Sequence, residues 1–404
     1  MLIKTGILNP VSPEKAEFIR KCFLEIRGDV IVSVSDKASG KDFIDYSDYL
    51  CTPGFIDLHA HLSQFSARGN SNPQLLDWLN NYVFPEEIKS FNPPYAEKIA
   101  EEFFTELKKS GTTSVIAYVS ASEKATDIAF RQAEKAGIRV WAGNVQMDCN
   151  APEKLCASTE ENLRISFALF EKWHQKTPLL NYIFTPRFAP VCSRELMKET
   201  GDYALKNKIK IQSHLSENHN ENLWVKDLFP ECKSYTEVYL KYGLLGENTI
   251  MAHCLHLQER EIKIMAETGT KIAHCPESNL FLKSGIFPLK EIEKAELSFG
   301  LGSDVAAGSS LFMPYHMRIM DYMQIKNYVP PEKTFYSATL GSAKVLNEHD
   351  SIGSIEVGKQ ADLAFWEIKD YALYNNARKI IQTMQYLPDK ASLKELLVAG
   401  KKVL

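Results

Sequence analysis

The stretch Pro53-Gly54-Phe55-Ile56-Asp57-Leu58-His59-Ala60-His61-Leu62-Ser63-Gln64-Phe65 decides the fold of this chain. Its first half is a short apolar run after a Pro-Gly turn, which predicts a buried β-strand. Side chains two positions apart on a strand point to the same face, so His59 and His61 can offer two imidazoles to one metal ion. A His-x-His pair is common without a metal, and further ligands are therefore required elsewhere.

Length and composition indicate a globular protein with one large domain and a smaller module. The chain has 404 residues, which allows two or three average domains, or one (β/α)8 barrel of about 250 residues plus a further module. Apolar residues make up 45% and charged residues 24% of the chain, which is typical of a substantial core. The net charge of −4 argues against nucleic acid as a ligand.

The sequence predicts a cytoplasmic protein that does not interact with a membrane. The first residues lack the layout of a secretory signal, and no apolar run of about 18 residues predicts a membrane span. The 8 cysteines form no Cys-x-x-Cys pair. We therefore expect them to be reduced and mostly buried thiols.

From residue 53, apolar strands alternate with helical segments, which indicates βα units and a parallel sheet. Eight strands fit a closed (β/α)8 TIM-like barrel, although an open doubly wound sheet fits the same count. The strands after the first are predicted at residues 112–119, 138–145, 181–187, 209–214, 249–253, 271–274 and 297–304.

The two ends of the chain have a different pattern from the middle. Residues 1–52 and 350–404 contain short β-like stretches, and we expect them to form one small β-sandwich beside a catalytic barrel of residues 53–349. The connection from Leu62 to about Phe91 carries Trp78, Tyr82 and Phe84. It is predicted as a long loop that walls a pocket, with packing in a surface helix as the alternative.

Three further strands end in residues that can bind a metal or move a proton. The predicted strands five, six and eight lead into His214, His253 and Asp304. Barrel enzymes have their active sites at this end of the strands. Three imidazoles and a carboxylate suit an ion such as Zn²⁺ with a water in the open position, so we predict His59, His61, His214 and Asp304 as its ligands.

The predicted chemistry is hydrolysis by a metal-activated hydroxide. A bound ion lowers the pKa of its water from about 15.7 toward about 7. We expect His253 to hydrogen-bond this water and Asp304 to take its proton. Glu217, three residues after His214, is placed to pass the proton to a ring nitrogen and to a leaving amine.

These motifs resemble the amidohydrolase superfamily. The similarity lies in residues 53–61, Ser213-His214, His253 and Gly302-Ser303-Asp304, framed by β-modules from both ends. Within the superfamily, residues 62–64, 185–190, 212–218, 274–280 and 300–306 are similar to members that act on guanine. Ala307 departs from the glycine that is usual there, and the first 50 residues match only loosely.

The resemblance implies a homodimer that hydrolyses guanine to xanthine and ammonia with one Zn²⁺ per subunit, Fe²⁺ being the alternative ion. It implies the four metal ligands given above and places Glu217, Asp304 and His253 in catalysis. With Trp78 from the aromatic connection, the expected substrate-binding residues are His61, Leu62, Ser63, Gln64, Trp78, Arg187, Phe188, His214, Glu217, His253 and Asp304.

The chemistry of these residues suits guanine. Arg187 offers a rigid fork of donors to the O6 carbonyl, and Phe188 offers a ring for stacking. Gln64 can donate and accept along the purine edge. Adenine has an amine donor where guanine has O6, and such a mismatch can discriminate by about 10⁴-fold. An ion pair between Arg187 and a loop acid is the alternative.

Three other functions fit parts of the pattern. The chain can be a superfamily aminohydrolase for cytosine, an adenosine-type or a triazine substrate, or a non-catalytic scaffold. A binuclear hydrolase generally needs a bridging lysine at the end of strand four, where this chain has Thr185-Pro186-Arg187. We therefore predict one metal ion per subunit.

Overall fold

The computed structural model describes residues 1–72, 74–369 and 374–404. Two compact units can be separated within it. One contains residues 1–57, 105–115 and 310–404, and the other contains residues 58–104 and 116–309. The domain boundaries at residues 52 and 349 stay predictions.

Strands from both ends of the chain form one mixed sheet of seven strands in the order β17-β16-β15-β4-β1-β2-β3. β15 pairs with β4 in an antiparallel ladder, with Leu363 opposite Pro53. Alternating side chains such as Leu24 and Ile26 on β2 are buried in its core. The strands are β1 (Leu2–Ser12), β2 (Lys15–Arg27), β3 (Val30–Ser35), β4 (Ile44–Pro53), β15 (Leu363–Ile368), β16 (Ala391–Val398) and β17 (Lys401–Lys402).

The predicted β-module built from both chain ends is therefore present, but its individual strands begin and end at other residues than predicted. β1 and β4 were not predicted as long strands, because their polar and apolar residues mix without a clean alternation. Residues 352–360 were predicted as part of a strand, which is wrong, since they form turns and irregular structure before β15. Gly353 and Gly358 both have positive φ angles there, which interrupts an extended chain.

The second architectural element is a closed (β/α)8 barrel, as predicted. Its strands are β5 (Phe55–His61), β6 (Thr112–Tyr118), β7 (Arg139–Gly143), β9 (Leu180–Tyr182), β11 (Ile211–Leu215), β12 (Thr249–His253), β13 (Lys271–His274) and β14 (Phe299–Leu301). Short strands β8 (Val145–Gln146) and β10 (Thr185–Pro186) extend β7 and β9. All residues of β5, β6 and β7 are buried, as expected for parallel strands that are covered by helices.

Backbone hydrogen bonds close the ring of strands. The strands form the ladders β5-β6-β7-β9 and β11-β12-β13-β14, and a bridge between Phe184 and Ile211 joins the two. At the other junction, the Asp304 amide donates to the His59 carbonyl at 2.7 Å, and the His61 amide donates to the Val305 carbonyl at 2.7 Å. These bonds exclude an open sheet and bring the ends of β5 and β14 together.

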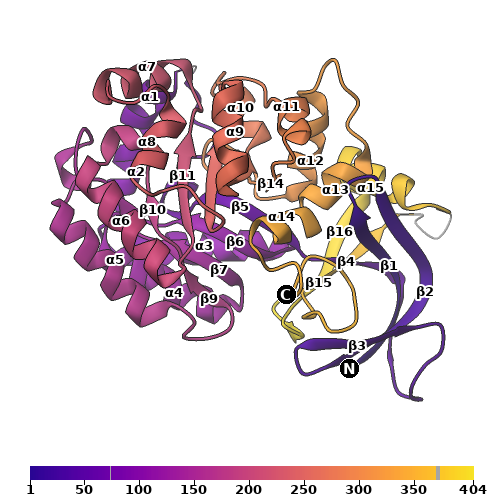
Figure 1. The fold of residues 1–404 in the computed structure, drawn as a ribbon. Coiled ribbons are helices and arrows are strands. Elements are labelled where there is room, and N and C mark those ends of the chain that lie inside the picture. The colour runs from indigo at the N-terminus through magenta and orange to yellow at the C-terminus, as the bar shows by residue number, and fades with distance from the viewer. Residues whose placement is uncertain (73, 370–373) are drawn as a thin grey trace. The chain divides into compact units, whose positions relative to one another are not determined.

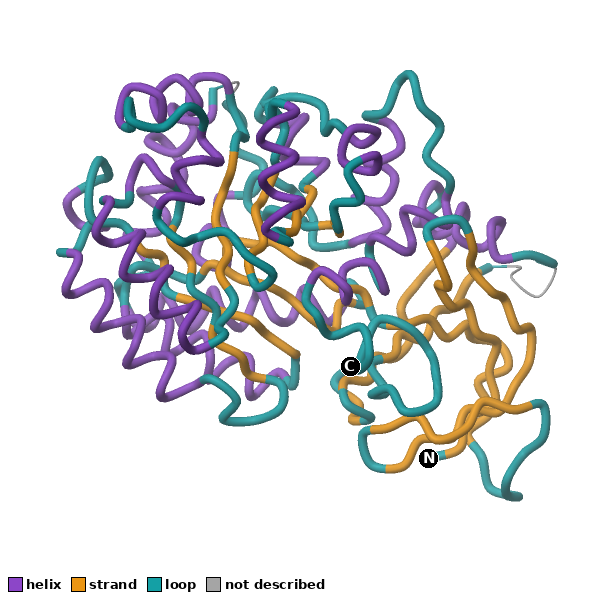
Figure 2. The backbone as a smooth tube through the Cα atoms, viewed as in Figure 1, coloured by secondary structure: helices purple, strands orange, loops and turns teal. Residues whose placement is uncertain are grey.

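Helices cover the outside of the barrel strands (Figures 1 and 2). Ser122, Ser158, Ser193 and Ser234 each cap one of them by accepting a backbone N–H. The helices between the strands are α3 (Pro93–Lys109), α4 (Glu123–Ala136), α5 (Thr159–Trp173), α6 (Arg194–Asn207), α7 (His219–Leu228), α8 (Tyr235–Lys241), α9 (Glu259–Thr268), α10 (Pro276–Phe281) and α11 (Leu289–Lys294).

Four helices follow the barrel strands: α12 (Met313–Tyr322), α13 (Pro331–Ser337), α14 (Leu340–Val345) and α15 (Ala377–Tyr386). No helix among the described residues combines the length and the apolar character that crossing a membrane requires.

The connection after β5 is helical where a loop was predicted, but it lines a pocket through Trp78, as predicted. It folds as η1 (Leu62–Ala67), α1 (Leu75–Trp78), η2 (Leu79–Val83) and α2 (Phe84–Lys89). Its helices are short and irregular, and their apolar residues follow no single helical period. Trp78 and Phe84 are buried, whereas Tyr82 is 37% exposed.

Candidate active site

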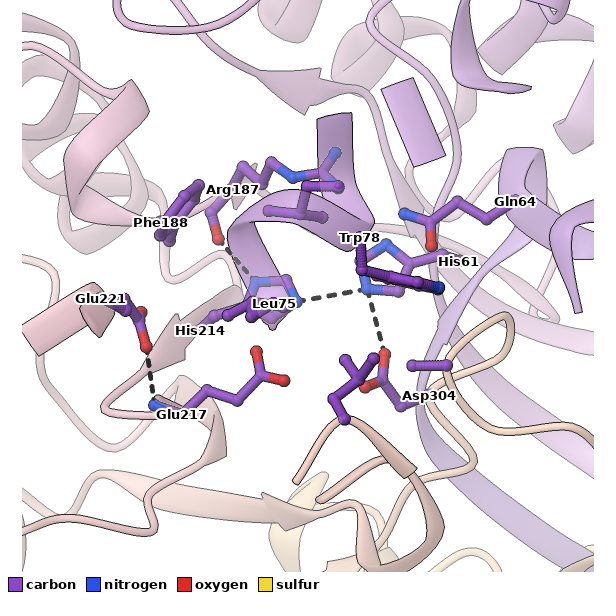
Figure 3. A pocket seen from close by; sticks show the side chains of 13 residues that line it. His61, Gln64, Leu75, Trp78, Arg187, Phe188, His214, Glu217, Glu221 and Asp304 are labelled. Carbon is purple, nitrogen blue, oxygen red and sulfur yellow. Dashed lines mark hydrogen bonds and ion pairs between the residues drawn. The ribbon is translucent and has the colours of Figure 1, made fainter. Parts of the chain in front are cut away.

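Four side chains converge at the carboxyl ends of the barrel strands. His59 and His61 lie on β5, His214 lies on β11, and Asp304 is the third residue after the end of β14. The Nε2 atom of His61 lies 3.2 Å from the Nε2 atoms of His59 and His214, and Asp304 Oδ1 lies 3.3 Å from the Nε2 atoms of His59 and His61. Figure 3 shows His61, His214 and Asp304 pointing toward one another.

These distances suit a divalent metal ion. Four ligand atoms at about 2.0–2.2 Å from a tetrahedral ion lie about 3.3–3.6 Å from one another. The four ligand atoms of this set all lie within 4.8 Å of one another, and all four residues are buried. A second set, with His253 and Cys275 in place of His61 and His214, also contains His59 and Asp304. The two sets overlap and mark one buried site.

Neighbouring groups orient two of the imidazoles. Gln212 donates from Nε2 to the Leu58 carbonyl at 2.6 Å, so its Oε1 is the atom that accepts from His59 Nδ1 at 2.9 Å. His214 Nδ1 lies 2.6 Å from the Arg187 carbonyl, to which it donates. With the proton on Nδ1, each imidazole presents the lone pair of Nε2 to the centre of the cluster.

Burial favours the protonation states that a metal ligand needs. Desolvation lowers the pKa of His61 to about 3 and holds the pKa of His214 well below its usual value. Burial acts to raise the pKa of Asp304, but the adjacent imidazoles of His59 and His61 outweigh it and hold this pKa well below its usual value. Near neutral pH the two histidines are therefore neutral and Asp304 is a carboxylate.

Two further titratable groups lie next to the cluster. His253 ends β12, and its Nε2 atom lies 3.4 Å from Glu217 Oε2 and 3.7 Å from Asp304 Oδ2. Asn279 Oδ1 accepts from His253 Nδ1 at 2.9 Å, which leaves Nε2 as an acceptor. Burial lowers the pKa of His253 to about 4. Burial, followed by the negative charges of Asp304 and Glu221, raises the pKa of Glu217 well above its usual value.

Glu221 holds the backbone that carries Glu217. Its Oε2 atom accepts from the Glu217 amide at 2.8 Å and from the Asn218 amide at 3.0 Å. The Asn218 and Glu221 side chains together form a capping box at the start of α7. Figure 3 shows this bond between Glu221 and the Glu217 backbone. These hydrogen bonds fix the backbone from which the Glu217 side chain extends into the cavity.

We expect Glu221→Gln to change how stability depends on pH. Burial raises the pKa of Glu221 from 4.5 to about 7 in the folded chain. A raised acid pKa stabilises the fold below pH 4.5, and this contribution is lost as the pH rises through 7. Between pH 5 and pH 8, the free energy of unfolding of the wild type should therefore fall relative to the variant, by about 2–3 kcal/mol. Urea unfolding at both pH values measures this difference, and parallel pH curves for the two proteins would contradict it.

A small cavity, which leaves about 30 Å³ for the centres of water-sized spheres, lies against the cluster. Both polar and apolar side chains line it, and Figure 3 shows the labelled polar groups on several sides. Its lining residues are His61, Gln64, Leu75, Trp78, Leu79, Arg187, Phe188, His214, Glu217, Glu221, Leu282, Asp304 and Ala307.

Comparison with known proteins agrees with this geometry. The amidohydrolase family model matches residues 50–403. The chain belongs to the amidohydrolase family. Among curated members, it is 36% identical over 375 residues to guanine deaminase of Escherichia coli (strain K12), covering 89% of this chain and 84% of that protein. It is also 36% identical over 385 residues to guanine deaminase of Dictyostelium discoideum, covering 89% and 84%.

Solved amidohydrolase structures match the whole chain. The crystal structure of guanine deaminase from C. acetobutylicum with bound guanine has a TM-score of 0.94 and 32% sequence identity, and the match covers 100% of this chain and 99% of that one. The E. coli guanine deaminase structure has a TM-score of 0.95 and 31% identity, with the same coverage.

The amidohydrolase fold gathers most of the residues that the sequence singled out. His61, Gln64, Trp78, Arg187, Phe188, His214, Glu217 and Asp304 line the cavity. His59 and His253 are buried and contact Asp304 beside it. Leu62 and Ser63 are buried in η1, but they are not among the residues that line the cavity. The assignment of roles to these residues stays a prediction.

Several residues of the site were not predicted from the sequence. Glu87 pairs with Arg187, which is the ion pair left open as the alternative for this arginine, at 2.6 Å from Oε1 to Nη1. No local pattern relates these two residues, which are 100 positions apart in the chain. Gln212 had a detectable signal, because it lies two positions before His214 on one strand and so shares its inward face.

Proposed function

We propose that this amidohydrolase hydrolyses guanine to xanthine and ammonia. One observation carries the proposal: three histidines and an aspartate meet beneath a cavity in which Arg187, Gln64 and Phe188 are gathered. The similarity to guanine deaminases over nearly the whole chain supports the same activity.

The residues present fit one metal ion, and we propose Zn²⁺. His59, His61, His214 and Asp304 would hold it through three nitrogens and one oxygen, a ligand set that zinc accepts. When bound, such an ion supplies Lewis acidity that makes hydroxide available near neutral pH. A binuclear site of this kind generally needs a bridging lysine at the end of strand four. This chain has Thr185-Pro186-Arg187 there, which supports one ion per subunit.

The reaction replaces the amine at C2 of guanine by the oxygen of water. His253 Nε2 and Asp304 Oδ2, which are 3.7 Å apart, both face the place where a water molecule would attack C2. Asp304 accepts one proton from this water. Glu217 delivers its own proton to the ring nitrogen next to C2. It then transfers the proton of the new C2 hydroxyl to the amine, which leaves as ammonia when the C–N bond breaks, and the proton held by Asp304 restores Glu217. Its raised pKa suits this role because the carboxyl group can hold a proton near neutral pH.

The cavity walls are placed to recognise a planar purine with a carbonyl group. Arg187 offers donors to O6, and Phe188 and Trp78 offer rings that can contact the base. Arg187 uses Nη1 for both bonds to Glu87. Nε and Nη2 form no hydrogen bond within the described residues. The ion pair and the recognition of O6 are therefore compatible.

The experiment that tests the function is a steady-state assay of the purified full-length chain on guanine, adenine and cytosine. We expect xanthine and ammonia to form in equal amounts from guanine, with little turnover of the other two. Turnover of cytosine without turnover of guanine would overturn the proposal. A protein that binds no metal and hydrolyses none of them would indicate a scaffold.

We also propose a cytoplasmic homodimer, as expected from the family. All 8 cysteines are free thiols, which is typical of a reducing compartment. Light scattering after gel filtration would give the mass of the assembly, and a mass of 45.8 kDa would show a monomer instead. Elemental analysis of the same sample would identify the metal and its stoichiometry.

A further inference from the structure

Glu87 lies behind the cavity wall and contacts both polar residues of the predicted purine edge. It belongs to α2 and is 2% exposed. Its Oε1 accepts from Arg187 Nη1 at 2.6 Å and from Gln64 Nε2 at 2.8 Å, and its Oε2 accepts from the same Nη1 at 2.8 Å. Glu87 itself is not among the residues that line the cavity.

The carboxylate decides which end of the Gln64 carboxamide faces the cavity. A carboxylate only accepts hydrogen bonds, so the amide must turn its NH₂ group toward Glu87. The oxygen then points away from Glu87, and within the described residues nothing donates to it. In Figure 3 the nitrogen of Gln64 faces the guanidinium of Arg187 and the oxygen lies on the side of His61.

We infer that Glu87 fixes the hydrogen-bond polarity of the purine pocket, with Arg187 as donor and Gln64 as acceptor. This inference rests on the proposed function and deepens it. Glu87 is a positioning residue, because it acts through Gln64 and Arg187. By holding both side chains, it makes the site specific for purines that have a carbonyl at C6.

The chemistry of the bases explains this specificity. A 6-oxopurine presents an acceptor at O6 next to a donor at N1–H, which complements one donor and one acceptor in the protein. A 6-aminopurine presents a donor at C6 next to an acceptor at N1, the opposite pattern. Without Glu87, the Gln64 carboxamide could turn over and present its NH₂ group, so the pocket would lose its preference. An arginine without its carboxylate would also be less firmly placed.

Hypoxanthine and adenine provide a matched test. Neither has an amine at C2, so neither contains the group that would leave, and they differ at the C6–N1 edge. Calorimetric titration of the full-length, metal-loaded protein gives both dissociation constants without any turnover. For the wild type we expect hypoxanthine to bind at least about 10²-fold more tightly than adenine.

Glu87→Gln should reduce this ratio by about 10-fold or more, mainly by weakening the binding of hypoxanthine. The matched control is Glu86→Gln at the neighbouring position. Glu86 binds Lys89 and the Tyr95 hydroxyl and does not contact Gln64 or Arg187. We expect the control to keep the wild-type ratio.

A buried arginine without its partner can destabilise the fold, so a second variant is needed. Glu87→Asp keeps the charge but shortens the side chain by one methylene, and we expect it to fold and to lower the ratio. An unchanged ratio in a folded Glu87 variant, or equal binding of both purines by the wild type, would overturn the inference. Guanine turnover is measured in a separate assay. If the wild-type protein did not hydrolyse guanine, the proposed function would be refuted, but the binding constants for hypoxanthine and adenine would still test the role of Glu87.

Discussion

Glu217→Gln is expected to lower kcat for guanine by at least about 10²-fold while the bound metal stays in place. Glutamine has nearly the same shape, but it cannot release and take up a proton at neutral pH. The Glu217 carboxyl group is buried beside His253 and Asp304, and its pKa is raised well above the usual value. Its Oε2 atom lies 3.4 Å from His253 Nε2, within the site.

The measurement is steady-state kinetics together with elemental analysis of the same preparation. Glu259→Gln is a suitable control, because it makes the same chemical change at an exposed position at the start of α9. A small change in KM with a large loss in kcat would place Glu217 in the chemical step. Near-normal kcat in Glu217→Gln would remove this residue from the mechanism.

His214→Ala is expected to abolish metal binding and to lower kcat/KM by at least about 10³-fold. The substitution removes one of three imidazoles from a set in which the Nε2 atoms of His61 and His214 are 3.2 Å apart. A site with one ligand fewer binds the ion more weakly. Without the ion, the pKa of the attacking water would stay near that of bulk water, and hydroxide would not be available at neutral pH.

Elemental analysis and the guanine assay test this variant, and circular dichroism checks that it is folded. His349→Ala serves as the control, because the His349 side chain is 44% exposed and is not part of either potential ligand set. A folded His214→Ala protein that kept a full equivalent of metal would show that His214 is not a ligand.

Much of the fold could be predicted because its signals are local. Each barrel strand is a short apolar run, and its terminal residue is visible in the sequence. His59, His214, His253 and Asp304 were therefore recognised from their places at strand ends. The irregular helices after β5 were not recognised, because their apolar residues follow no single period.

The contacts of the cavity wall could not be predicted in the same way. Glu87 belongs to a short helix, and its partner Arg187 follows a strand 100 positions later. The sequence allowed an ion pair with some loop acid, but no spacing rule identifies which one. Glu87 also accepts a hydrogen bond from Gln64. The NH₂ group of Gln64 therefore faces Glu87 in the folded chain.

The sequence by itself predicted the alternation of strands and helices, four candidate metal ligands and the class of reaction, whereas the backbone hydrogen bonds of the folded chain decided that the sheet closes into a barrel. The sequence could do so because strand periodicity fixes the direction of a side chain relative to its neighbours. Only the tertiary structure decided which way Gln64 and Arg187 present their polar atoms. That orientation depends on a buried carboxylate from a distant segment, and a hydrogen bond across a folded chain leaves no trace in local sequence.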